Sequence, residues 1–226
     1  MIISDDLVVN SSDNKNMNYF YIFCSIYVTS ILCAMTVSAR IINLSIPFTT
    51  HSFLITGGTL IIPIAFFSQD IITEIFGFCK AKQTLFISMI LVSFFVGYIF
   101  IITLLPCTSN NQTCDAYYNL GISLPRHLFA FLASFSFGIA TNNLILSKLK
   151  KYLKGKHLAF RFIFSTAVGE IALQFIGTTF AWFGNMNFIS EILPFIIISL
   201  LYKISFEVIT TPINIWICNK LSSDNK

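Results

Sequence analysis

Long uncharged apolar runs recur along the chain, and each is close to the length needed to cross a lipid bilayer. A bilayer-crossing helix needs about 20 mostly apolar residues. Six stretches meet this requirement, at about 19–39, 53–68 (with apolar character continuing to 76), 84–105, 128–146, 162–183 and 189–217. The runs are continuous rather than alternating, which favours helices over a membrane barrel. The pattern predicts an all-α, polytopic integral membrane protein with six transmembrane helices.

Composition excludes most other classes of protein. Of the 226 residues, 55% are hydrophobic and only 11% are charged, whereas an average globular chain carries about 25% charged residues. The mean hydropathy is +0.78. A soluble enzyme, a nucleic-acid-binding module and a disordered protein are therefore excluded. The net charge of +4 is too small to indicate a polyanion, so no nucleic-acid partner is expected.

Basic residues predict the orientation of the chain. They gather between spans two and three (Lys80 and Lys82) and between spans four and five, from Lys148 to Arg161. With six spans, both tails share the side of these loops, which the positive-inside rule makes the cytoplasm. Five spans would put the tails on opposite sides, and the cluster between spans four and five could instead bind anionic lipid or RNA.

The expected domain organisation is simple. Residues 1–17 form an acidic, Asn/Ser-rich leader that we expect to be a disordered cytoplasmic tail rather than a cleavable signal peptide. Residues 18–221 form a single six-helix transmembrane transporter domain, and residues 222–226 form a second cytoplasmic tail. The expected location is a bacterial inner membrane, with the lipid bilayer as the surrounding partner.

The cysteines and histidines give no sign of a metal site or of catalysis. Cys107 and Cys114 lie in the long outer loop with six residues between them. A disulfide and two free thiols both remain open there. No CxxC or HExxH pattern occurs, and no His has a nucleophile and an acid at triad-like spacing. We therefore expect no metal, no cofactor and no enzymatic activity.

Five ionisable residues fall within or beside the apolar runs, where each charge costs at least about 2.5 kcal/mol on insertion scales. They are Asp70, Glu74, Glu170, Lys203 and Glu207. The first two share a helical face at the end of span two, where they are either solvated at the interface or act in gating. Lys203 and Glu207 have the same spacing, so they form either an internal ion pair or two separate contacts, with a carboxylate left to bind a solute.

Two prolines interrupt spans that carry these acids. Pro63 precedes Asp70 in span two, and Pro212 follows Glu207 in span six. A proline leaves the carbonyl four residues earlier without its donor. These spans are either simple kinked helices or the discontinuous helices that build transporter sites.

Four stretches of the sequence resemble a known family, the queuosine precursor transporters, also called the vitamin uptake transporter family. Together they cover roughly positions 57 to 217. They are Pro63-Ile-Ala-Phe-Phe-Ser-Gln-Asp70-Ile-Ile-Thr-Glu74-Ile-Phe-Gly77 with Ala81-Lys82; Ala133-Ser134 through Asn142 to Lys148-Leu-Lys150; Gly155-Lys156-His157 through Arg161 and Ser165-Thr166 to Gly169-Glu170; and Lys203, Glu207 and Thr211-Pro212. The chain departs from the family at Glu170 and Leu173, where an amide and an aspartate are usual. One carboxylate has therefore moved by about a turn along the same helix.

The resemblance implies import of a guanine-like base: 7-cyano-7-deazaguanine, 7-aminomethyl-7-deazaguanine or queuine, for transfer RNA modification. A carboxylate suits the N1–H and 2-amino edge of such a ring, and Phe side chains with Trp182 would stack on its faces. The expected substrate-binding residues are Glu170, Glu207, Asn142, Gln174 and Lys203. Asp70 and Glu74 are expected to serve gating or coupling.

The energy source is not determined by the sequence. Proton coupling, facilitated diffusion and an ATP-driven partner remain open, and no phosphate-binding loop occurs in this chain, so any ATPase would be a separate subunit. Homo-oligomers are also compatible with it. The alternatives are a binding subunit for another vitamin-like heterocycle and a membrane structural or assembly protein whose buried charges only lock helices together.

Overall fold

The computed structural model describes residues 3–45, 52–107, 112–184 and 186–223, and it confirms the six membrane-length helices. The long helices are α1 (Ile3–Val37), α2 (Gly57–Ile71), α3 (Phe78–Thr103), α4 (Gln112–Tyr152), α5 (Leu158–Trp182) and α6 (Leu193–Ser223). Two short π-helices, η1 (Ile72–Phe76) and η2 (Phe188–Ile192), extend α2 and precede α6. The chain is a multi-pass membrane protein, and all six spans lie within one bundle.

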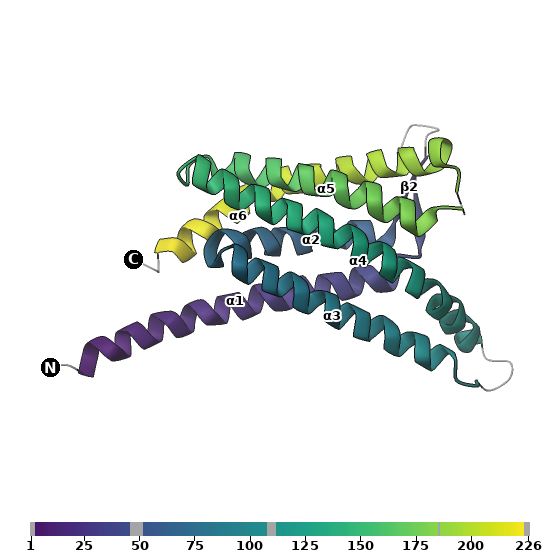
Figure 1. The fold of residues 1–226 in the computed structure, drawn as a ribbon, viewed down its shortest axis with the longest axis horizontal. Helices are drawn as coiled ribbons and strands as arrows, with labels where there is room; N and C mark the ends of the chain where they lie inside the picture. The colour runs from purple at the N-terminus through teal and green to yellow at the C-terminus, as the bar shows by residue number, and fades with distance from the viewer. Residues whose placement is uncertain (1–2, 46–51, 108–111, 185, 224–226) are drawn as a thin grey trace.

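Both termini lie at the same end of the bundle (Figure 1). The junction between α4 and α5, which contains the basic residues from Lys148 to Arg161, is also at this end, which we call the basic end. The other end, the hairpin end, carries the strands and the junction between α3 and α4. The arrangement agrees with an even number of spans. That the basic end faces the cytoplasm stays a prediction.

Glycines allow two helix pairs to approach closely. A Cβ added at Gly169 would lie 2.8 Å from the carbonyl oxygen of Gly138, and one at Gly57 would lie 2.8 Å from the carbonyl oxygen of Val37. Small residues at such positions let membrane helices pack backbone to backbone. These contacts bring α4 against α5 and α1 against α2.

A two-stranded hairpin replaces the predicted start of span two. Strands β1 (Ile41–Ser45) and β2 (Ser52–Thr56) are antiparallel, with Ile41 opposite Thr56. Helix α2 then begins at Gly57, where the Thr56 hydroxyl accepts from the Thr59 backbone N–H at 3.3 Å. An apolar run does not by itself distinguish a strand from the first turns of a helix.

The prolines do not break their helices. Pro63 lies inside α2 and Pro212 inside α6, and both helices continue through them. The spans of the structure are thus continuous rods rather than the discontinuous helices considered above.

The structure bears on two further expectations, one about the cysteines of the outer loop and one about the N-terminal leader. Cys107 and Cys114 form a disulfide, which resolves the alternatives left open by the sequence. Helix α1 begins at Ile3, so most of the leader expected to be a disordered tail has helical backbone, and its membrane-length part begins at Met17.

Candidate functional site

A partly open cavity of about 120 Å³ lies toward the hairpin end of the bundle. Its walls come from α1, α2, α4, α5 and the beginning of α6. The cavity is smaller than the one of about 150 Å³ that admits a benzene ring, so a larger flat molecule would extend through its open side.

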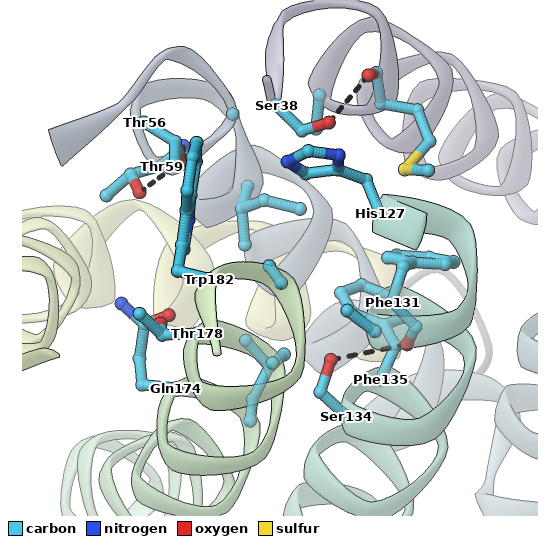
Figure 2. Close-up of a pocket in the computed structure, with 18 of the residues that line it drawn as sticks. Ser38, Thr56, Thr59, His127, Phe131, Ser134, Phe135, Gln174, Thr178 and Trp182 are labelled. Carbon is cyan, nitrogen blue, oxygen red and sulfur yellow. Dashed lines mark hydrogen bonds between the residues drawn. The ribbon is translucent and has the colours of Figure 1, made fainter. Parts of the chain in front are cut away.

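Aromatic side chains from two helices face each other across the cavity. Trp182 lies on the α5 side, opposite Phe131 and Phe135 of α4 (Figure 2). The two phenylalanine rings stack at 4.4 Å between centroids, and the His127 ring meets Trp182 edge to face at 5.5 Å. Arg126 donates to the carbonyl oxygen of Phe183, which ties the end of α5 to α4 beside this tryptophan.

Several polar atoms at the cavity are buried without a hydrogen-bond partner. Gln174 is 6% exposed, lines the cavity and leaves its Nε2 unpaired. The Nδ1 of His127 bonds the carbonyl oxygen of Ser123 at 2.9 Å, and its Nε2 is also unpaired. Most buried polar groups in proteins are paired, so these atoms are candidates to meet a ligand. The hydroxyls of Ser134 and Thr178 add further donors and acceptors to the lining.

A buried ion pair forms the floor of the cavity. Lys203 lines the cavity, and its Nζ lies 2.8 Å from Oε2 of Glu170. Both side chains are at most 3% exposed, and Oε1 of Glu170 has no partner. Lys203 therefore reaches across from α6 to α5. In the structure this cross-helix pair takes the place of the internal Lys203–Glu207 pair that the sequence left open.

A pair of acids, Asp70 and Glu207, forms a second layer deeper in the bundle. Asp70 is fully buried, and its two oxygens accept from Asn142 Nδ2 at 2.8 Å and from the Thr166 hydroxyl at 3.3 Å. The side chain of Glu207 is within hydrogen-bonding reach of Asp70, and its Oε1 is unpaired. Four helices, α2, α4, α5 and α6, each contribute one of these four side chains.

The third layer closes the bundle toward the basic end. Glu74, carried by η1, accepts two hydrogen bonds from Arg161, at 3.0 and 3.1 Å, and lies 3.1 Å from Nζ of Lys150. Arg161 is only 1% exposed. Beyond it lies a second cavity of about 630 Å³, whose lining includes Glu74, Lys150, His157, Arg161, Cys218 and Asn219.

The predicted site residues are divided among these layers. Gln174 and Lys203 line the cavity, and Glu170 lies directly behind its floor. Glu207 and Asn142, expected to bind substrate, lie below the floor beside Asp70 and do not line the cavity. Asp70 and Glu74 are four residues apart but contact different partners, and a π-helical turn, wider than an α-helical one, begins between them at Ile72.

Sequence reasoning missed three site residues with strong contacts: Arg161, Thr166 and His127. Arg161 and Thr166 were noted only as parts of a resemblance, and Arg161 was also counted with the basic loop. Thr166 precedes Glu170 on α5 by four residues, about one turn, which places these two on one face of the helix. Arg161 precedes Glu170 by nine residues, and this spacing gives no such signal. His127 offered no such signal.

The described residues contain no group of three His, Cys, Asp or Glu side chains that could hold a metal ion. The family model described as "Putative vitamin uptake transporter" matches residues 56–217, which include all three charged layers. The chain belongs to the vitamin uptake transporter family. Among curated proteins and solved structures, nothing matches this chain. A vitamin uptake transporter implies a small-molecule substrate, and the cavity with its aromatic walls is a candidate site for one.

Proposed function

We propose that this vitamin uptake transporter imports a flat, guanine-like queuosine precursor across the bacterial inner membrane for transfer RNA modification. The main observation in support is the small cavity between Trp182 and the Phe131–Phe135 pair, with the unpaired Nε2 of Gln174 at its edge. Family membership supports transport of a vitamin-like molecule. The choice of a deazaguanine follows from the sequence resemblance, and the chemistry of the cavity is compatible with it.

Stacking would supply most of the affinity. Trp182 and the phenylalanines of α4 stand on opposite sides of the cavity (Figure 2), so a flat ring inserted between them would have aromatic side chains on both sides. Base–aromatic stacking contributes about 1–3 kcal/mol per base. Every heterocycle has such faces, so stacking alone does not select guanine.

The polar groups would select the ring by its edges. The Gln174 amide offers N–H donors to a ring carbonyl, and the unpaired Nε2 of His127 accepts from a ring N–H. Glu170 lies behind the floor and leaves one carboxylate oxygen unpaired, so it would form charge-assisted bonds with the N1–H and 2-amino edge of a guanine ring only after the floor rearranges around the ligand. Because Lys203 already neutralises this carboxylate, a neutral ring is favoured over a cationic one.

Release into the cytoplasm requires the basic end to open. The Glu74–Arg161–Lys150 cluster separates the deep acids from the large cavity at that end. We propose that the structure is the state open toward the hairpin end and that this cluster is the inner gate, broken when the bundle rearranges around the bound base. Asp70 would then serve coupling and Glu74 gating.

The test is uptake in a bacterial strain that cannot make queuosine, supplied with this gene and an external precursor. Queuosine should reappear in transfer RNA only when both are present. Trp182→Ala and Gln174→Leu should abolish the reappearance at low precursor concentration. Trp216→Ala is the matched control, since Trp216 is 62% exposed on the outside of the bundle. Equal restoration by all three variants would refute this site.

A structural or assembly protein is the alternative from another class, favoured by the buried ion pairs that tie α5 to α6 and α5 to η1. It predicts that no deazaguanine changes the thermal stability of the purified protein. A transporter gains stability by linkage, by about 2.7 kcal/mol at a ligand concentration of 100 Kd. A ligand-dependent shift that Trp182→Ala removes would exclude the structural role.

A further inference from the structure

The acids in the membrane interior outnumber the cations that directly contact them. Among the described residues, Lys203 pairs with Glu170, and Arg161 and Lys150 pair with Glu74. Asp70 and Glu207 take part in none of these ion pairs, although both are at most 2% exposed. Asp70 accepts hydrogen bonds from the neutral Asn142 and Thr166, and the side chain of Glu207 lies within hydrogen-bonding reach of Asp70.

Two bare carboxylates cannot lie side by side away from water without strong repulsion. The strain is relieved when one carries a proton and donates it to the other. The unpaired Oε1 of Glu207 is then the position from which a proton is gained or lost. Neutral donors on Asp70, rather than a cation, leave the pair free to change its charge.

We propose that the Asp70–Glu207 pair is the binding site of the proton that drives import. The proposal rests on the proposed function, which it deepens by naming the coupling ion. In each cycle one proton passes from the hairpin side to the pair and then to the basic side, together with one base, and no covalent bond other than O–H forms or breaks.

The position of the pair suits this role. On α6, Glu207 lies one turn from Lys203 at the cavity floor, and on α2 and η1, Asp70 lies four residues from Glu74 at the inner gate. A change of charge at the pair therefore alters the electrostatic field both at the cavity floor and at the inner gate. With both acids protonated, α2 and α6 separate without exposing an unpaired charge to the membrane interior.

Other titratable groups around the pair are accounted for by their contacts. On the cavity side these are Lys203 and Glu170, and on the basic side they are Glu74, Arg161, Lys150 and Cys218. Helix α1 has no charged side chain from Met17 to Val37, and Lys80 and Lys82 of α3 are exposed. Within the described residues, the pair is thus the acidic site that is left to exchange a proton.

The test uses the full chain in proteoliposomes with a radiolabelled deazaguanine base. With the outside one pH unit more acidic, one proton per base supports accumulation up to about tenfold, and a protonophore should abolish it. Asp70→Asn and Glu207→Gln should lose accumulation while retaining exchange of labelled for unlabelled base. Asp115→Asn, an exposed acid at the hairpin end, is the control and should accumulate like the unaltered protein.

Each outcome decides the proposal. Accumulation by both variants, or accumulation by the unaltered protein that follows a sodium gradient instead, overturns proton coupling and leaves the proposed function standing. Absence of exchange in the unaltered protein overturns both. If one variant does not fold, the other carries the test. A further measurement needs no variant: adding base to lightly buffered protein should change its bound protons, and no pH change across a titration would contradict the proposal.

Discussion

The ion pair between Lys203 and Glu170 gives the sharpest stability prediction. Both side chains are nearly inaccessible, and Nζ and Oε2 lie 2.8 Å apart. Lys203→Met keeps the length of the side chain and removes the ammonium, which leaves the Glu170 carboxylate without a cation. Removing one partner of a buried pair costs about 3–5 kcal/mol. At about 2–4 °C per kcal/mol for a chain of this size, the midpoint of thermal unfolding should fall by about 6–20 °C.

Removing the second partner should restore most of this loss. Replacing a whole buried pair by neutral groups of similar volume is often close to neutral. Glu170→Gln combined with Lys203→Met should therefore be more stable than Lys203→Met alone. The coupling energy of the double-mutant cycle should reach at least about 2 kcal/mol, within the range for residues in direct contact.

The assay is thermal unfolding of purified protein in detergent, followed by the fraction that remains monodisperse. The control cycle combines Lys203→Met with Glu207→Gln. The native Lys203 and Glu207 have the spacing of an ion pair along one helix, but in the structure Lys203 pairs with Glu170 instead. The changes in unfolding free energy of the two single variants in this control cycle should be closer to additive than those in the Glu170 cycle. Stronger coupling with Glu207 than with Glu170 would refute the cross-helix assignment and support the internal pair.

The remaining predictions concern packing, the gate and the loop. Gly169→Val should prevent α4 and α5 from packing and lower the yield of folded protein. At Gly97 an added Cβ meets nothing within 4 Å, so Gly97→Ala should gain about 1 kcal/mol of stability from helix propensity. Equal yields of the two variants would contradict the close approach of α4 and α5. Arg161→Gln should halt uptake. Arg161→Lys should retain only part of it, because an ammonium cannot form the two parallel hydrogen bonds that the guanidinium donates to Glu74. Uptake assays, with the protein level measured in membrane fractions, test both variants. Mass mapping without reductant should find Cys107 linked to Cys114, and free thiols at both positions would contradict the structure.

The sequence was sufficient for the spans because a bilayer imposes a length and an absence of charge that a single chain displays directly. It also indicated which ionisable residues the bundle encloses, since Asp70, Glu74, Glu170, Lys203 and Glu207 all lie in its ion pairs or in its pair of acids. Their cost in lipid is the reason that such residues stand out.

Partners across helices could not be read in the same way. Lys203 is four residues from Glu207 on one helix, yet its ammonium contacts Glu170 on another, and spacing along one helix does not report such a choice. The position of Glu74 relative to Asp70 depends on a π-helical turn, which the helix propensities of the residues do not predict. Trp182 was expected to stack, but its opposing wall of Phe131 and Phe135 emerges only when α4 packs on α5 (Figure 2).

The most direct test of the central claim is equilibrium binding of a radiolabelled deazaguanine base to the purified protein. The account predicts one saturable site per chain, competed by unlabelled guanine-like bases, and weakened by about 5- to 150-fold in Trp182→Ala, the equivalent of about 1–3 kcal/mol of lost stacking. Saturable binding of unchanged affinity in Trp182→Ala, or no saturable binding to folded protein, would contradict it.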